Sequence, residues 1–148
     1  MSATFSSWGT AASSSTTTVS PSYPSSPQAG DLMVLFVGIK PTSRTVSTPT
    51  GWDKIVDGAS GGTGSDGVDT GQTKQYVFVK TADGTETGTM NVTVTSTTGS
   101  VAIAQIGLVT KGADESFTIF SGAYFDDDAS SNTSWATDFG VANLQTND

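Results

Sequence analysis

The residue types that most often carry out chemistry in proteins are scarce in this sequence. It has no histidine and no cysteine, so the commonest general base, the commonest metal ligand and all thiolate chemistry are excluded. The two glutamates, Glu86 and Glu115, both lie in turn-like segments, whereas glycoside hydrolysis needs two carboxylates at a set separation in a fixed cleft. No serine lies in a G-x-S-x-G motif. We therefore predict no catalytic residues and no enzymatic activity.

Aspartates are the candidate metal ligands. Asp66 and Asp69 lie in SDGVDTG, a loop-like stretch whose oxygens could bind Ca²⁺, although the spacing fits no EF-hand. Asp126, Asp127 and Asp128 form a second group, but three adjacent side chains fan out and cannot all face one ion. Ca²⁺ is thus the one cofactor considered, with Asp66, Asp69, Asp126 and Asp128 as weak candidate ligands. Solvated acidic loops are the more ordinary interpretation of both groups.

Aromatic residues are the candidate binding residues, because their flat faces stack on sugars and fill protein interfaces. We consider Trp8, Tyr23, Tyr124 and Trp135 as candidates, and Trp8 and Trp135 lie in less regular segments. For the tryptophans a place in the core is the commoner alternative. Trp52 follows Pro49 and Gly51 at the start of an alternating segment, so we expect a tight turn to deliver it into the core.

The segments that would position these residues have the sequence pattern of β-strands. Thr and Ser account for 46 of the 148 residues, which suits hydroxyl-rich outer faces of sheets. No segment has the 3.6-residue apolar period of a helix. We expect an all-β, antiparallel β-sandwich or jelly roll of about eight to ten short strands, including residues 31–39, 52–56, 73–80, 89–95, 101–110, 117–125 and 133–142.

Details of the pattern make these expectations more specific. The run 31–39, DLMVLFVGI, is apolar on both faces, which predicts a central strand buried on both sides. In 73–80, Tyr76 and Phe78 share one face, and Val77 and Val79 share the other. Residues 58–72 are rich in glycine and nearly devoid of apolar side chains, so we expect a long loop there.

Charge and organisation limit the partners and the location. The net charge of −8 and pI of about 4.1 disfavour nucleic acids and anionic membranes. There is no apolar run long enough for a transmembrane helix, and the N-terminus does not look like a secretory signal. We divide the chain into residues 1–29, a Ser/Thr/Pro-rich extended arm or edge strand, and residues 30–148, a β-sandwich domain.

The order of four segments, GDLMVLFVG, TPTGWDKI, QYVFVKTADGTETGTMNVTV and AIAQIGLVTKG, resembles a jelly-roll-like domain of bacteriophage virion and prophage surface proteins. The resemblance covers roughly residues 28–115 and rests on Gly30-Asp31-Leu32, Thr48–Trp52, Lys80–Glu86 and Lys111-Gly112-Ala113. These are turn and strand-start residues, so the resemblance implies a fold and a virion setting rather than a catalytic site.

Members of this family usually have a further buried strand beginning where this sequence ends. We therefore expect either a fragment or a sheet that another chain completes.

The resemblance implies a capsid decoration or cement protein, made in the host cytoplasm and located in the virion. Its expected partners are the major capsid protein or other virion proteins, and further copies of itself, with a trimer favoured. The alternative is a receptor- or carbohydrate-binding module of a phage tail fibre or surface adhesin, for which long Gly/Asp loops are suited.

Overall fold

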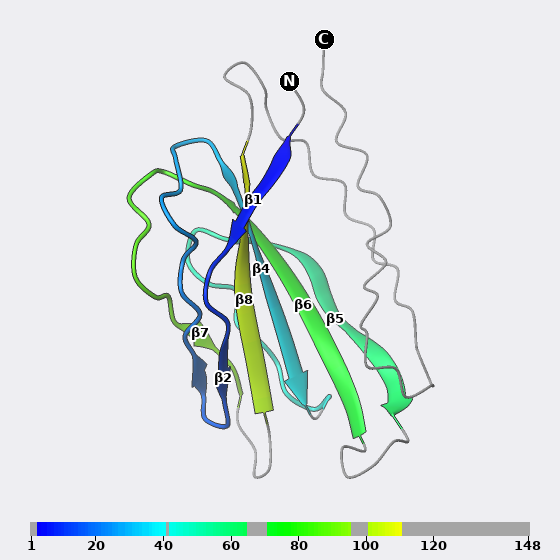
Figure 1. The fold of residues 1–148 in the computed structure, drawn as a ribbon. Coiled ribbons are helices and arrows are strands. Elements are labelled where there is room, and N and C mark those ends of the chain that lie inside the picture. Colours follow the sequence, from blue (N-terminus) through cyan, green and yellow to red (C-terminus); the bar gives the residue numbers. More distant parts are fainter. Residues whose placement is uncertain (1–2, 41, 65–70, 96–100, 111–148) are drawn as a thin grey trace.

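The computed structural model describes residues 3–40, 42–64, 71–95 and 101–110. These residues form eight strands and no helix (Figure 1), which confirms the predicted all-β class. In chain order the strands are β1 (Thr4–Trp8), β2 (Ala12–Ser14), β3 (Thr18–Val19), β4 (Leu32–Lys40), β5 (Asp53–Gly64), β6 (Gly71–Thr81), β7 (Val92–Thr93) and β8 (Val101–Thr110). Within these ranges, accordingly, no helix is long and apolar enough to cross a membrane.

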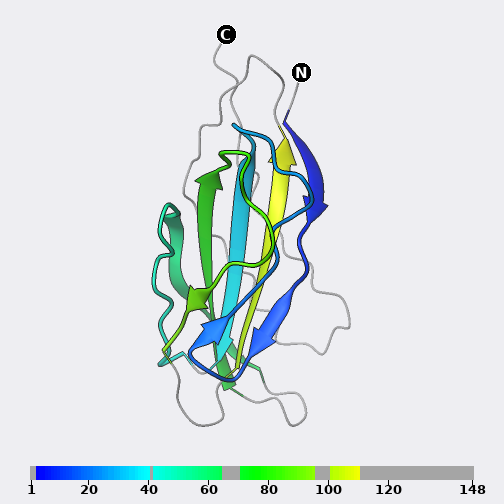
Figure 2. The ribbon, with the colours of Figure 1, turned by 90° about the vertical axis from the view of Figure 1, so that its left-hand side faces the viewer.

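The strands form two layers. The large sheet has the order β1-β8-β4-β6-β5, with β2 pairing with β8 beyond the end of β1, and all of its pairs are antiparallel. The small sheet consists of β3 and β7, and a bridge between Val46 and Val94 adds a third segment to it. Figure 2 shows β3 and β7 in front of the large sheet. The described chain is therefore a sandwich of unequal sheets.

The core lies between the two sheets and follows from alternation along the strands. On β4, the residues Met33, Leu35, Val37 and Ile39 are at most 2% exposed. Opposite them, the small sheet contributes its buried side chains, Val19, Val46, Val92 and Val94. Burying each such side chain contributes about 1.5–3 kcal/mol, so this double row is a large part of the core that stabilises the described residues.

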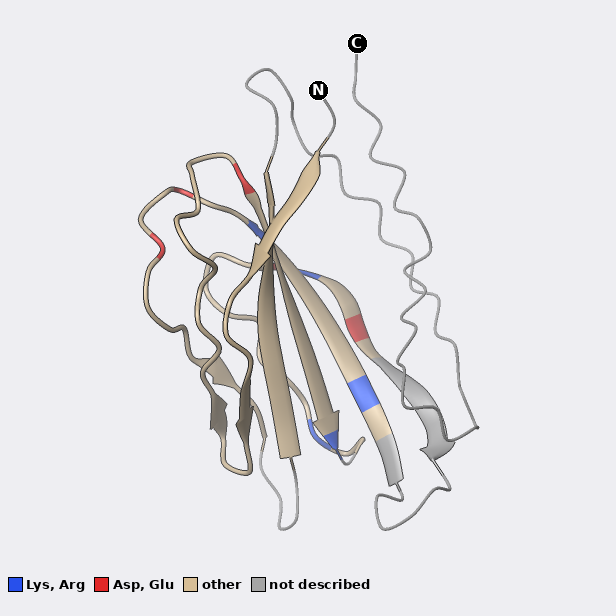
Figure 3. Ribbon diagram, in the orientation of Figure 1, with Lys and Arg blue, Asp and Glu red and all other residues tan. Residues whose placement is uncertain are grey.

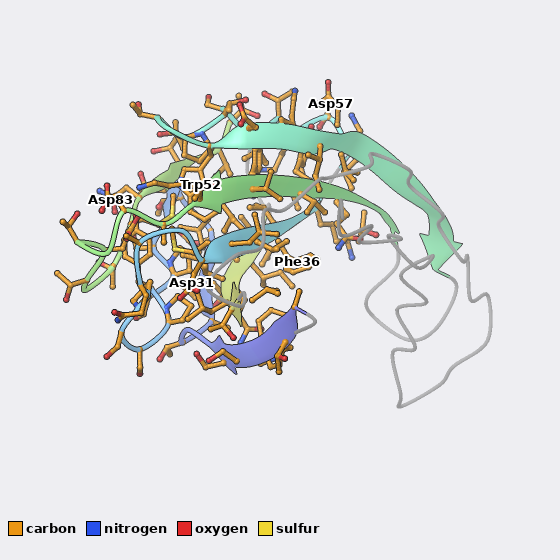
Figure 4. The ribbon with its side chains drawn as sticks, turned by 90° about the horizontal axis from the view of Figure 1, so that it is seen from above. Asp31, Phe36, Trp52, Asp57 and Asp83 are labelled. Atoms are coloured by element: carbon orange, nitrogen blue, oxygen red, sulfur yellow. The ribbon has the colours of Figure 1, made fainter. Side chains whose placement is uncertain are left out.

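The strand β4 is central, as predicted, but its two faces differ. Val34 and Phe36 point away from the core and are only partly buried. The prediction of complete burial on both sides is therefore wrong for the second face. Figure 4 shows Phe36 and Trp52 on opposite sides of the large sheet. We call the side that carries Phe36 the outer face.

The long loop expected at residues 58–72 is also corrected. β5 continues to Gly64 and β6 begins at Gly71, and the two strands pair out to this last position. Three register shifts interrupt the pairing. Gly58 has a φ of 62°, and a Cβ there would lie 2.9 Å from the Tyr76 hydroxyl. Glycine at position 58 thus allows the irregular path of β5. The strand forms although this stretch has almost no apolar side chains, because its backbone pairs with β6.

Candidate functional site

The motif from Lys80 to Glu86 forms a closed turn rather than a reactive site. The Lys80 Nζ lies 2.9 Å from Glu86 Oε1, and the Glu86 carboxylate also accepts the backbone N–H groups of Asp83 and Gly84. The Asp83 carboxylate in turn accepts the N–H and the hydroxyl of Thr85. Both carboxylates are therefore engaged in holding the turn.

The protonation of these groups follows from the same contacts. Burial acts to raise the pKa of Glu86, but the hydrogen bond from Lys80 and the backbone N–H of Asp83 outweigh burial, so that pKa lies below its ordinary value. The hydrogen bonds from Thr85 lower the pKa of Asp83. The bond to Glu86 raises the pKa of Lys80. At neutral pH all three groups are charged, which suits an ion-paired turn and not a general acid or base.

Two further polar residues of the motifs hold the chain in place. The Asp31 carboxylate, on a buried residue, accepts the N–H of Gln28 at the start of β4, as expected for a strand start. Trp52 donates its backbone N–H to the Pro49 carbonyl at 3.1 Å, and Gly51 has a φ of 79°. This turn delivers Trp52 into the core, where it is 5% exposed, as predicted.

Arg44 is a buried cation that joins three chain segments. Its side chain is fully buried, Nε donates to the Thr95 carbonyl, and Nη2 donates to the Thr16 carbonyl at 3.0 Å. Nη1 has no hydrogen-bond partner among the described residues. Burial lowers the pKa of this guanidinium. The residue links the segments before β3, after β4 and after β7.

Trp8 lies on the outer face, where it is half exposed, and not in the core. A bulge in β1 explains this placement: Phe5 pairs with Val109, Ser7 with Leu108 and Trp8 with Gly107, so that Ser6 is the extra residue. Residues three apart normally point to opposite faces of a strand, but the bulge turns Phe5 and Trp8 to the same one. Their ring centroids are 5.1 Å apart.

Gly107 provides the space that Trp8 occupies. A Cβ at this position would lie 2.8 Å from Cζ3 of Trp8, closer than contact allows. The indole therefore lies directly over the β8 backbone, and its ring centroid is 5.9 Å from that of Phe36 on the next strand. Ile103, further along β8, is 57% exposed. Together these side chains form an apolar patch on the outer face.

The two edges of the large sheet differ in charge. Residues 1–30 contain no charged side chain, and Figure 3 shows none on β1, β2 or β8. At the other edge, β5 carries Lys54 and Asp57, whose charged atoms are 2.7 Å apart, as well as three register shifts. Charges and bulges are devices that prevent an edge strand from pairing with another chain. β5 has both, whereas the edge formed by β1 and β2 has only the bulge at Ser6.

A shallow groove of about 340 Å³ lies over the small sheet. Tyr23 and Met90 supply partly buried apolar surface there, and polar groups come from Asn91, Thr93 and the segment 47–50. Burial raises the pKa of Tyr23, while Lys80 nearby acts to lower it. The phenol is therefore neutral at physiological pH, and the groove combines a stacking surface with uncharged hydrogen-bonding groups.

The structure separates the predicted site residues. Trp8 lies on the outer face and Tyr23 beside the small sheet, so they do not form one site. The remaining candidates lie outside the described residues: Asp66, Asp69, Asp126, Asp127, Asp128, Tyr124 and Trp135. Among the residues that the structure does describe, no group of three or more acidic side chains could hold a metal ion. The sequence analysis missed Phe5, for which the uncharged aromatic segment TFSSW was the available signal.

Comparison with known proteins identified no relative of this chain. No family model matches the chain, and neither the curated proteins nor the solved structures contain a match.

Proposed function

We propose that this chain is a structural protein of a bacteriophage virion that decorates the capsid and cements the shell across neighbouring capsid subunits. Support comes from the ordered motifs that resemble a jelly-roll-like virion domain, and from the sandwich of β-sheets that carries them. In this proposal the partner is the major capsid protein, and the copies assemble as trimers.

The observation that carries the proposal is the edge formed by β1 and β2. In the described part of the chain these strands pair on one side only, with β8, and they lie in a stretch without charged side chains. An open edge of this kind binds an extended segment of another protein by adding it as a further strand. The contrast with β5, which is charged and bulged, makes β1 and β2 the attachment side.

The test uses purified protein and capsids of the matching phage that lack it. Sedimentation with the capsids should show saturable binding, at hundreds of copies per particle. The variant S6K/S13K places two charges on the β1–β2 edge and should bind at least tenfold more weakly, because a buried lysine would have to be desolvated. Ser43→Lys, on an exposed residue elsewhere, is the control and should bind as the wild type does. Absence of binding by the wild type would rule out the proposal.

A second candidate function is glycan binding by a tail-fibre module, which the groove at Tyr23 favours. Its neutral phenol, amide and hydroxyl groups are the kinds of group that bind sugars. A glycan array should then give saturable binding that Tyr23→Ala abolishes, while capsid binding would be absent. Copy number also separates the two functions, since a fibre module is present at a few tens of copies or fewer.

A further inference from the structure

The edge formed by β1 and β2 is interrupted after Trp8. Ser22 donates its backbone N–H to the Thr10 carbonyl at 3.0 Å, and a Cβ on Gly9 would clash with the Ser22 carbonyl oxygen. The segment that contains Ser22 therefore occupies the edge at Gly9 and Thr10. The longest open stretch of this edge is β1, with five residues against three in β2, and no described strand lies beyond β1.

The backbone groups that β1 presents to a partner follow from its register with β8. Gly9 donates its N–H to the Ile106 carbonyl, so these two residues form a hydrogen-bonded pair. Hydrogen-bonded and non-hydrogen-bonded pairs alternate along an antiparallel ladder, and the next pair is Trp8 opposite Gly107. The N–H and C=O groups of Trp8 therefore point away from β8, toward the open edge.

The bulge at Ser6 gives Phe5 the same orientation as Trp8. Continued along β1, the alternation directs the backbone groups of Ser7 toward β8 and those of Phe5 away from it. Phe5 and Trp8 are three apart in the sequence, but the residues opposite them on β8, Val109 and Gly107, are only two apart. A strand added to this edge therefore meets donors and acceptors at the regular spacing of a sheet.

The side chains beside these groups determine what the added strand has to carry. Phe5 and Trp8 are both half exposed on the outer face, with ring centroids 5.1 Å apart. Directly opposite residues of two antiparallel strands have their side chains on the same face, with Cβ atoms about 4.5–5.5 Å apart. Two residues of the added strand, one opposite Phe5 and one opposite Trp8, would therefore contact these rings, and apolar side chains gain most from this contact.

Charge restricts the added strand further. Residues 1–30 contain no charged side chain, and neither does β8. A charged residue in the added strand would lose part of its hydration without an ion-pair partner on these strands. β5, at the opposite edge, differs because it carries the pair of Lys54 and Asp57. The β1 edge thus favours an uncharged partner.

We propose that β1 accepts, as an antiparallel strand, a short uncharged segment of a partner protein with apolar side chains at two alternate positions, one opposite Phe5 and one opposite Trp8. Antiparallel pairing continues the pattern of the large sheet and is slightly more stable per residue than parallel pairing. The main-chain hydrogen bonds supply affinity, and the two apolar positions supply specificity. This inference rests on the proposal that this edge is the attachment side, and not on the capsid as the partner.

The test uses the full chain, isotope-labelled for NMR, and short peptides with acetylated and amidated ends. The peptide NTVSVTN is uncharged and has two valines at alternate positions. At millimolar concentration it should bind saturably and shift the amide signals of Phe5 and Trp8, which gain hydrogen-bond partners, more than that of Ser7, which faces β8. The amide signals of Lys54 and Asp57, at the other edge, should not move.

Matched peptides separate this pairing from unspecific apolar binding. NTVVSTN has the same composition but places its valines on opposite faces, so it should bind about tenfold more weakly. N-methylation of both valines of NTVSVTN removes the donors that face β1 and should abolish binding. N-methylation of the serine between them, whose N–H faces away from β1, should leave binding unchanged.

Several outcomes would overturn the proposal. These are the absence of NTVSVTN binding, equal binding of NTVVSTN, and binding that survives methylation of both valines. Shifts of the Phe5 and Trp8 signals that grow with protein concentration in the absence of peptide would show instead that a second copy occupies the edge. Capsid binding without peptide binding would refute this inference alone, whereas the expected peptide binding without capsid binding would support it and remove the capsid as the partner.

Discussion

At the scale of single residues, the turn at Asp83 shows that side-chain contacts within a short motif determine its structural role. The sequence indicated a turn within Lys80–Glu86, and Gly84 indeed has a φ of 84°. What the spacing did not reveal is that Glu86 reaches back to two backbone N–H groups while it pairs with Lys80. Its side chain is only 4% exposed. One carboxylate therefore joins the end of β6 to the turn that follows it.

This arrangement makes stability depend on the charge of Glu86. Its pKa is lower in the folded chain, so its contribution is present above the ordinary pKa near 4.5 and is lost as the pH falls through the lowered value. Glu86→Gln should reduce the free energy of unfolding at pH 7 by about 1–2 kcal/mol, with a smaller difference at pH 3, measured by urea denaturation. Asp57→Asn, which breaks an exposed pair, should cost less than about 0.5 kcal/mol. Equal effects of the two variants would contradict the turn described here.

Gly107 is the residue on which the placement of Trp8 depends. Gly107→Ala adds a Cβ that would lie 2.8 Å from the indole, so we expect a loss of about 1–3 kcal/mol in unfolding free energy. In a Trp8→Ala background the same change should cost much less, because the clash is gone. A double-mutant cycle by chemical denaturation measures this coupling. Additive effects would show that the indole does not lie over Gly107.

At the scale of elements, β1 shows why the alternation of residues can mislead. Phe5 and Trp8 are three apart, an odd spacing that would place one of them in the core. Ser6 is the extra residue that brings both side chains to the outer face. Two adjacent serines, Ser6 and Ser7, do not indicate a bulge in the sequence. By contrast, the predicted sharing of one face by Tyr76 and Phe78 in β6 is confirmed, and the structure shows that this face is the one toward the core. Alternation predicts a face only as far as the strand stays regular.

Deletion of Ser6 tests this account of β1. The shortened strand keeps Phe5, Ser7 and Trp8 opposite the same residues of β8, so the fold should survive with a change below about 1 kcal/mol in unfolding free energy. The emission of Trp8, taken as the difference from Trp8→Phe in the same background, should stay that of a half-exposed indole. A blue shift would show that Trp8 has turned into the core and that the register is not the one described.

At the scale of the whole molecule, the class and the core were predictable but the coverage of the sheets was not. Apolar alternation sufficed to sort the residues of β6 by face, because that pattern is local, whereas β4 is apolar throughout and its sequence did not distinguish the inner face from the outer one. The extension of β5 through a glycine-rich run depends on pairing with β6, and the groove at Tyr23 depends on segments 20 to 70 residues apart. Such features arise from contacts across the fold, so no window of sequence contains them.

β1 and β2, the first strands of the chain, cover one edge of β8, the last described strand. Removal of residues 2–15 would expose the edge of β8, a long strand without charged side chains. We expect the truncated chain to lose cooperative thermal unfolding or to associate through this edge, as measured by calorimetry and light scattering. A truncated chain that is monomeric and as stable as the full one would contradict the structural role of β1 and β2.

The pairing of Thr4 with Thr110 also has a consequence for how the protein is made. A ribosome adds about 5–20 residues per second, so roughly 5–20 s separate the synthesis of β1 from that of its partner. During this interval Phe5 and Trp8 have no strand to lie on. Their neighbours are serine, threonine and alanine, a composition that keeps the waiting segment hydrated without charges that the finished edge would have to accommodate. A first segment without charged side chains thus suits both the nascent chain and the folded sheet.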